Sequence, residues 1–284
     1  MENKVEVRRL TGQPGESETL YRYLTIDKLM DFLMNTRITL SQLENVEDRL
    51  EGTTVPHLLL NLASASNEES LNTLTDGMFT VQVSPNERNV LRRQREEFQR
   101  LSYASCWYVD DHESVAMWQL YSRRDSVAIR IPFKALDEQL NGGHFEPSIN
   151  RIQCLKYGKV QYAKFNNISE LRQLTADPDL QGFLKDRGYQ HEREFRLVLR
   201  RENSEPNKIE QKPGVLIEHT NQMGLHLNIR AIHLLLTNFR SMPFEIVFHP
   251  QCPDWHRKNV VAILEKWDLP FRAQESMLKD MFLR

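Results

Sequence analysis

The chain has 284 residues, of which 40% are hydrophobic and 27% charged, with a formal net charge of -2. These values are ordinary for a globular protein with a buried core, and they exclude a field over the whole molecule that would draw it to nucleic acid or an anionic membrane. The three cysteines are widely spaced without a CxxC pair, which favours neither a zinc site nor a disulfide framework. No apolar run approaches the ~18 residues of a membrane span, and the charged N-terminus lacks the apolar segment of a signal peptide. We therefore expect a cytoplasmic protein without a membrane partner.

The first third of the chain is predicted as strand, helix, strand and, after an ambiguous stretch at 53–85, a second helix. The four elements cover 20–25, 26–36, 37–43 and 86–101. In the first helix, Ile26, Leu29 and Leu33 recur at helical spacing. In the second, arginines alternate with glutamates, which is more typical of a solvated surface than of a nucleic-acid-binding face.

The remainder alternates between strands and helices without a regular βαβ rhythm. Predicted in order are strand 102–109, helix 112–122, strand 125–132, hairpin 149–165, helix 177–188, strands 193–200, 213–220, 224–229 and 244–250, and helix 253–268. The predicted hairpin turns at Tyr157 and Gly158. Gly188 ends the predicted helix 177–188. The pattern predicts an α+β fold with a bent, mostly antiparallel mixed sheet and flanking helices, in a single domain over 1–284. Residues 53–101 are an insertion or a lid.

Familiar catalytic and nucleotide-binding motifs are absent, so the candidates are polar residues inside otherwise buried strands. Burying such groups is costly unless they are paired, and function tends to lie at such places. Arg22 lies between Tyr21 and Tyr23 on the first strand. Its guanidinium either holds a phosphate or carboxylate through two parallel hydrogen bonds, or reaches solvent.

A second candidate is "SCW" at 105–107, followed by the helix "HESVAMWQLYS". Ser114, Trp118 and Tyr121 share one face of that helix, and Glu113 precedes them. Alternatively, Trp118 is a core residue, while Glu113 and Ser114 only cap the helix. Cys106 has no neighbour that would activate it, which favours a buried, inert thiol.

A third candidate is "HEREFRLV", whose alternation places Glu192, Glu194 and Arg196 on one face of a strand. These charges either form salt bridges on the surface or line a cleft. Two glutamates beside an arginine could orient a ribose hydroxyl or act as a general base. Asp48 and Glu51 of "EDRLEG" are either part of an exposed turn or one edge of the same site.

The order of these segments resembles the bacterial family known as domain of unknown function 2971, described near abortive-infection and phage-defence genes. "YRY" matches its opening strand, and "EDRLEG" matches an acidic turn. "SCWYVDDHESVAMWQLYSRRDSVAI" and "HEREFRLV" match two later blocks, so the likeness spans about residues 20–275. It implies that Asp48 and Glu51 line one cleft with the later motifs.

The layout is also remotely similar to ADP-ribosyltransferases, whose split sheet binds NAD. This resemblance implies that Arg22, with Arg196 nearby, holds the phosphates or ribose of NAD, and that Ser105 supports the nicotinamide pocket. Tyr23 or Trp107 would stack on nicotinamide. Glu192 or Glu194 would orient the ribose 2′-hydroxyl and stabilise the transition state.

Three functions stay open. The first is an NAD-using transferase or glycohydrolase, acting as a toxin or phage-defence effector on a nucleic-acid or protein acceptor, with a neighbouring antitoxin or regulator. The second is a nuclease-like hydrolase in which Asp48, Glu51, Glu113 and Glu194 hold a divalent cation. The third is a non-catalytic module that binds a nucleotide or a partner. Arg22 within reach of Glu194 in one cleft favours the first, and clustered carboxylates without a facing arginine favour the second.

Overall fold

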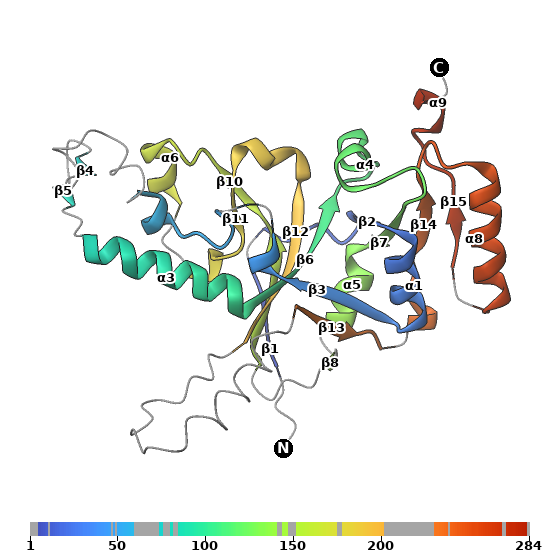
Figure 1. Cartoon of the computed structure of the whole chain (residues 1–284), viewed down its shortest axis with the longest axis horizontal. Coiled ribbons are helices and arrows are strands. Elements are labelled where there is room, and N and C mark those ends of the chain that lie inside the picture. The colour runs from blue at the N-terminus through green and yellow to red at the C-terminus, as the bar shows by residue number, and fades with distance from the viewer. Residues whose placement is uncertain are drawn as a thin grey trace, which may run out of the picture.

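The computed structural model describes residues 5–10, 12–46, 48, 50–59, 74–75, 80–81, 85–140, 144–146, 152–174, 178–201, 230–237, 239–268 and 271–282. Within them, eleven strands form one mixed, mostly antiparallel sheet flanked by helices, which is the predicted α+β class (Figure 1). Its strands are β1 (Glu6–Arg9), β2 (Thr19–Leu24), β3 (Arg37–Gln42), β6 (Ser102–Val109), β7 (Val127–Pro132), β8 (His144–Glu146), β9 (Ile152–Lys159), β12 (Glu194–Arg201), β13 (Ala231–Leu235), β14 (Glu245–Phe248) and β15 (Ala273–Gln274).

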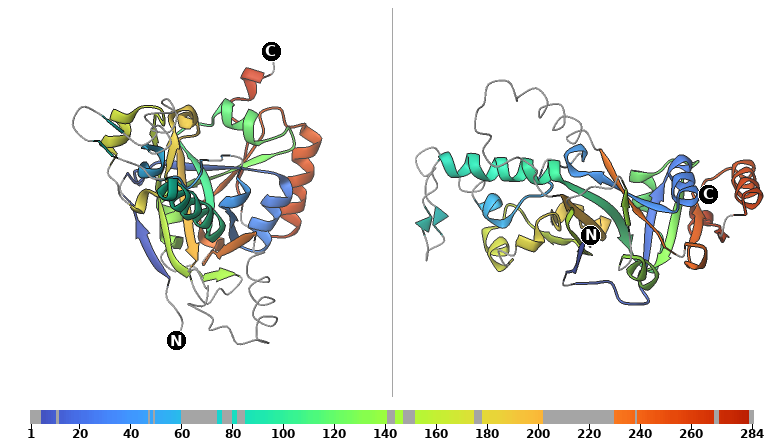
Figure 2. Two further views of the ribbon diagram at one scale, coloured as in Figure 1. Left: turned by 60° about the vertical axis from the view of Figure 1, so that its left-hand side comes forward. Right: turned by 90° about the horizontal axis from the view of Figure 1, so that it is seen from below.

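Shorter strand pairs and helices complete the described structure. The pairs are β4 (Leu74–Thr75) with β5 (Thr80–Val81), and β10 (Gln161–Ala163) with β11 (Leu184–Asp186). The α-helices are α1 (Ile26–Met34), α3 (Pro85–Leu101), α4 (Val115–Tyr121), α5 (Phe133–Leu140), α6 (Ile168–Gln173), α8 (Asp254–Lys266) and α9 (Lys279–Phe282), with a helical segment at 55–59. The 3-10 turns are η1 (Leu43–Asn45), η2 (Pro178–Leu180), η3 (Arg187–Glu192) and η4 (Phe239–Ser241). Helices α3 and α8 lie at opposite ends of the molecule (Figures 1 and 2).

The sheet forks at strand β6. On one side β6 pairs with β12, which continues to β9 and β1. On the other side it has two neighbours, because β2 pairs with residues 108–109 and β3 with residues 103–104. Beyond β2 come β7, β14 and β15, and beyond β3 come β13 and β8. Residues 105–107 of β6, the "SCW" segment, pair with neither branch and so lie at the fork.

Alternation along the strands separates two faces at this fork. On one face, Leu20, Trp107 and Phe195 belong to the main core, which also contains residues of α1, α5 and α8. On the other face, Tyr21 and Tyr108 pack in a smaller cluster with α4. The fork therefore joins the two faces of the sheet through a gap in its hydrogen-bonded ladder.

Two predicted elements differ from the structure. The hairpin at 149–165 is wrong, because β9 runs through Tyr157 and Gly158, and Gly158 pairs with Arg196 inside the ladder. Strand β10 pairs instead, in parallel, with β11. The helix at 177–188 is wrong as well, because Gly182 adopts a φ of 87°, which lies in the left-handed region and stops a helix. That segment forms η2, β11 and the start of η3.

Other predictions fall on residues that the structure does not describe. These include the strands at 213–220 and 224–229 and most of the ambiguous stretch 53–85. The interpretation of 53–101 as an insertion or a lid, and the single-domain assignment, stay predictions. In the part of the chain that is described, every helix is too short or too polar to cross a membrane.

Candidate functional site

A cavity of about 630 Å³ lies at the fork of the sheet, with lining residues from β2, α1, β3, β6, α4, β11 and β12. This volume is within the range of ~300–1,000 Å³ that small-molecule sites occupy. The predicted site residues that line it are Arg22, Tyr23, Glu51, Trp107, Tyr121, Glu194 and Arg196. A more open hollow of about 790 Å³ lies at the start of α6, between residues 164–169 and residues 186–188. The cavity at the fork is the better candidate because charged groups are buried around it.

Arg22 crosses the fork on the β2 side. It is the first residue of β2 beyond the pairing with β6, and its Nη2 donates a 2.7 Å hydrogen bond to the carbonyl oxygen of Thr39 on β3. Its guanidinium carbon lies 5.5 Å from the ring centre of Trp107. Among the described residues Arg22 forms no ion pair, and burial lowers its pKa to about 10. A cation in this state is stabilised by an anionic ligand, and it remains charged at neutral pH.

The opposite wall carries a buried cation between two glutamates. Arg196 is 1% exposed and binds Glu51 with both terminal nitrogens, at 2.6 and 2.9 Å. Its Nε donates to Glu194 Oε2 at 2.6 Å, and Nη1 also donates to the carbonyl oxygen of Gly182 at 2.8 Å. Burial opposes the charge of Arg196, but Glu194 and Glu51 outweigh it and raise its pKa. Its hydrogen bonds are directed at the protein, so Arg196 positions Glu51 and Glu194. It is therefore not free to bind NAD, although the resemblance implied that it does.

Lys185 extends this charged wall. Its Nζ donates to Glu192 Oε2 at 2.5 Å and lies 3.4 Å from Glu194 Oε1. The hydroxyl of Tyr121 donates to Glu192. Glu194 lines the cavity, whereas Glu192 is 2% exposed and does not. The predicted alternative of a salt-bridge ladder on the surface is thereby wrong: these charges are buried, and only Glu194 of the two glutamates reaches the cavity.

The register of the "SCW" segment separates its three side chains. Cys106 is opposite Arg196 and is exposed to the cavity, although protein surrounds it closely and this burial raises the pKa of its thiol to about 12. The thiol is therefore protonated and a poor nucleophile at neutral pH, which agrees with the predicted inert thiol. The predicted burial is wrong, because the residue is exposed. Ser105 faces the core, where its Oγ accepts a 3.1 Å hydrogen bond from Trp107 Nε1. Ser105 is buried beside Trp107 and does not line the cavity where the resemblance placed it.

The residues at the start of α4 form a structural contact. Glu113 accepts hydrogen bonds from Trp118 Nε1 at 2.9 Å, from Ser276 Oγ at 2.5 Å and from the amide of Met277 at 2.8 Å. Ser114 caps α4 by accepting from the amide of residue 117. Glu113 thus ties α4 to the C-terminal segment, and it lies outside the cavity lining together with Ser114 and Trp118. Of the alternative predicted for this helix, the core position of Trp118 and the cap by Ser114 are confirmed, whereas Glu113 binds Trp118 and the C-terminal segment and does not cap the helix.

Tyr23 connects this contact to the cavity. It lines the cavity, its ring meets that of Trp118 edge-on at 4.8 Å, and its hydroxyl accepts from the amide of Ser114 at 3.2 Å. Tyr21 lines the cavity beside it. Tyr23 and the exposed Tyr121 give the cavity aromatic surface on which a planar ligand can stack, whereas Tyr21 and Trp107 are almost fully buried.

The acidic turn divides into a structural and a cavity residue. Asp48 accepts from the amide of Leu50 at 2.9 Å and does not line the cavity. Glu51 is fully buried and holds Arg196. Of the pair that the resemblance assigned to the cleft, only Glu51 reaches it, because Asp48 is used to close the turn.

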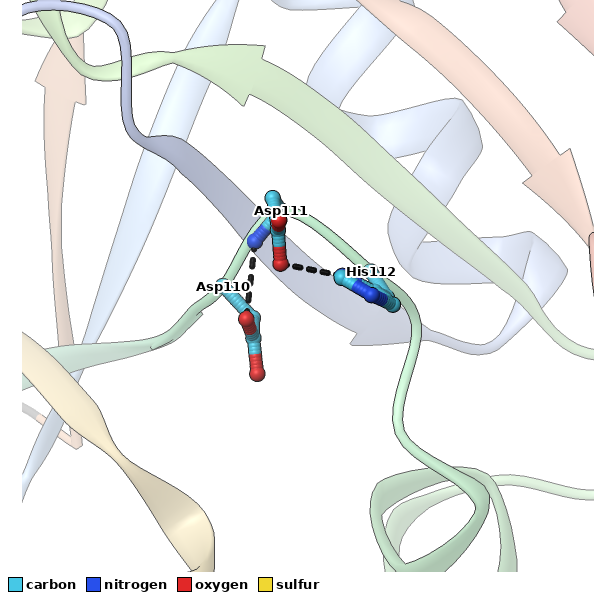
Figure 3. A group of neighbouring side chains, drawn as sticks. All are labelled: Asp110, Asp111 and His112. Atoms are coloured by element: carbon cyan, nitrogen blue, oxygen red, sulfur yellow. Dashed lines mark hydrogen bonds and ion pairs between the residues drawn. The ribbon is translucent and has the colours of Figure 1, made fainter.

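The carboxylates that a nuclease would require do not converge. Glu51 and Glu194 both bind Arg196, whereas Asp48 closes a turn and Glu113 binds residues 276–277. Among the described residues, the group with metal-ligand atoms within 4.8 Å of one another is Asp110, Asp111 and His112 (Figure 3).

That group is a loop held by its own contacts. Asp110 accepts from the hydroxyl of Tyr108 at 2.5 Å, from Arg193 and from the amide of Asp111 at 2.9 Å. The imidazole of His112 contacts Asp111. Both oxygens of Asp110 are already engaged, and the group lies outside the cavity, so it adds nothing to the site.

The buried charges predict how stability depends on pH. Burial alone would raise the pKa of Glu194, but Arg196 and Lys185 outweigh it and hold the pKa below its ordinary value of 4.5. A carboxyl group whose pKa is lowered by folding stabilises the protein above its unfolded pKa, and this contribution is lost as the pH falls through the folded pKa. We expect the melting temperature of the wild type to fall more steeply than that of Glu194→Gln below about pH 4.5. Parallel thermal-unfolding curves for the two proteins, measured from about pH 7 to about pH 3, would contradict this.

Sequence reasoning missed several cavity residues. Lys185 lies within the predicted helix 177–188, but in the structure it belongs to the short strand β11, and its neighbours in the sequence do not indicate that its charge is buried. Asp31, Arg37 and His233 also line the cavity. They come from three different elements, and no local pattern connects them.

Comparisons of the chain with protein-family models, with curated proteins and with solved structures find no match.

Proposed function

We propose that the cavity at the fork binds NAD, and that the chain breaks the bond between nicotinamide and ribose, as an ADP-ribosyltransferase or an NAD glycohydrolase does. The observation that carries the proposal is that Arg22 and Glu194, from strands far apart in the sequence, line one cavity. In this arrangement Arg22 binds the diphosphate of NAD, and Glu194 binds the ribose that carries nicotinamide.

The distribution of charge supports this orientation. Around Arg22 the cavity lining contains the cations Arg37 and Lys28 with the carboxylates Asp27 and Asp31, so that end carries one excess positive charge. The opposite wall holds Lys185 and Arg196 with Glu51 and Glu194. Glu192 lies behind this wall and pairs with Lys185, so the buried cluster as a whole carries one excess negative charge. NAD has the matching polarity, because its diphosphate is anionic and its nicotinamide ring is cationic. Complementary potentials of this kind fix the orientation of a bound ligand.

The chemistry assigned to Glu194 is electrostatic. When the bond to nicotinamide breaks, nicotinamide leaves with the bonding electrons and positive charge develops on the ribose. The nucleophile, either water or an acceptor group, then bonds to the ribose carbon and loses a proton. A fixed carboxylate at the ribose stabilises that developing charge and orients the 2′-hydroxyl. Arg196 and Lys185 contribute by keeping Glu194 ionised and in place.

A second candidate, a module that binds a nucleotide without cleaving it, is favoured by one observation. Glu194 already contacts two cations, Arg196 at 2.6 Å and Lys185 at 3.4 Å. These ion pairs neutralise part of the charge that catalysis requires. The two candidates share the binding step and differ in the release of nicotinamide.

Replacing Arg22 tests the binding step. We expect Arg22→Gln to weaken the binding of NAD and of ADP-ribose by about 10- to 100-fold, because hydrogen bonds to a charged group contribute about 1.5–3 kcal/mol. Isothermal titration calorimetry measures the affinities, with Arg93→Gln on the exposed side of α3 as the control. Equal affinities for wild type and Arg22→Gln, or no binding of NAD to the wild type, would refute the proposed site.

We also propose membership of the resembling family and a role as a phage-defence effector or toxin with a neighbouring antitoxin or regulator. These proposals rest on the four motifs and their order. The acceptor would be a nucleic acid or a protein.

A further inference from the structure

A second cavity of about 300 Å³ lies on the other side of the turn that carries Glu51. Its lining includes Gly52, Thr54, His57 and Gln181, together with Arg95 of α3 and Arg200 of β12. It shares no lining residue with the cavity at the fork. Its volume, at the low end for ligand sites, suits a small ion or a small monoester better than a dinucleotide.

The two arginines of this cavity have no carboxylate partner among the described residues. In the described parts of the chain, neither Arg95 nor Arg200 forms an ion pair, and Arg200 stacks on Phe98 with its guanidinium carbon 5.6 Å from the ring centre. Glu97 is the single carboxylate among the described lining residues, so positive charge is in excess. Two unpaired guanidinium groups facing one small cavity are a typical arrangement for binding phosphate.

A second observation points to a ligand. The Nε of Arg95 is buried and has no hydrogen-bond partner in the part of the chain that the structure describes. Leaving a buried donor unsatisfied is costly, and such groups in native proteins commonly mark a missing ion or water. His57 adds a polar group to the same wall, where its Nδ1 lies 3.0 Å from Thr53 Oγ1.

We propose that this second cavity binds a phosphate group, as free phosphate or as a small phosphomonoester, between Arg95 and Arg200. The bound phosphate would also stabilise the turn at Gly52, because Gln181 of the same wall donates to the carbonyl oxygen of Gly52 at 3.0 Å. Glu51, the next residue along the chain, holds Arg196 in the cavity at the fork. The site is independent of the NAD proposal, because different residues form it.

Thermal unfolding in phosphate tests this site. Inorganic phosphate is titrated against chloride at equal ionic strength, and ribose 5-phosphate serves as a second probe. We expect phosphate to raise the melting temperature by roughly 5–10 °C at about 100 times its Kd. Arg95→Gln and Arg200→Gln should each abolish most of this shift. Arg92→Gln, on the exposed side of α3, and Arg22→Gln, in the other cavity, should retain it. A larger shift with ribose 5-phosphate assigns the site to a phosphomonoester, and a larger shift with inorganic phosphate assigns it to the free ion.

Two results would overturn the proposal. One is an equal effect of phosphate and chloride on the wild type. The other is a shift that persists in Arg95→Gln and Arg200→Gln but disappears in Arg22→Gln, which places the phosphate at the fork. Should the arginine variants fail to fold, amide hydrogen exchange of the wild type gives the answer. Phosphate should slow exchange at residues 52–57 and 181, and unchanged exchange there excludes binding.

Discussion

Arg196→Met is expected to lower the free energy of unfolding by about 3–5 kcal/mol, since removing one partner of a buried ion pair leaves the other uncompensated. Glu51, which is fully buried, would lose both of its hydrogen bonds to the guanidinium. Glu194 would keep only its contact with Lys185. Urea denaturation followed by circular dichroism measures the change, which should appear as a lower midpoint with a similar slope.

The control for this variant is Arg92→Met on α3. Arg92 is 59% exposed and pairs with Glu96 at 3.8 Å. Exposed pairs of this kind contribute about 0–1 kcal/mol, so Arg92→Met should leave the midpoint nearly unchanged. If Arg196→Met and Arg92→Met have equal, small effects, Arg196 is not the centre of the buried charge network.

Glu194→Gln is expected to reduce NAD cleavage by about 10²- to 10⁴-fold, the range over which a positioned acid–base or electrostatic group contributes to rate. Glutamine keeps the shape of the side chain and can still accept a hydrogen bond from Arg196 Nε. The loss therefore should fall on kcat, while NAD binding at Arg22 should remain within a few-fold of the wild type. Nicotinamide release under saturating NAD gives kcat directly.

Stability must be followed alongside activity in this variant. Glu194 contacts both Arg196 and Lys185, so Glu194→Gln is also expected to cost stability. Glu245→Gln is the matched control, because Glu245 is a partly buried carboxylate that pairs with Arg130 at 2.9 Å and lies outside the cavity lining. A large loss of stability in Glu194→Gln with unaltered cleavage would mark Glu194 as part of a structural ion pair alone.

Strand alternation carries much of what the sequence predicts about the site. The alternation in β12 correctly places Phe195, Leu197 and Leu199 on the core face and Glu194 and Arg196 on the other. A two-residue period is a local property, so it can be read from a short segment. The period does not identify the partner of each charge. The partner of Arg196, Glu51, lies in a turn 145 residues away in the sequence.

The errors have local physical causes. Glu192 is separated from the strand because Arg193 adopts a φ of 39°, and the chain turns there before β12 begins. The predicted helix 177–188 contains Lys185, but Gly182 adopts a left-handed conformation that prevents this helix. Ser105 lies on the same face of β6 as Trp107, whose large side chain packs in the core, so Ser105 points into the core as well. In each case one backbone angle or one large side chain decides where the polar group points.

The decisive measurement is mass spectrometry of nicotinamide after the purified protein is incubated with NAD, with and without cell extract. We expect nicotinamide from the wild type, less of it from Arg22→Gln when NAD is below saturation, and almost none from Glu194→Gln. Calorimetric binding of NAD with no nicotinamide under either condition would leave a nucleotide-binding module. If the protein neither binds NAD nor releases nicotinamide, the proposed function is wrong.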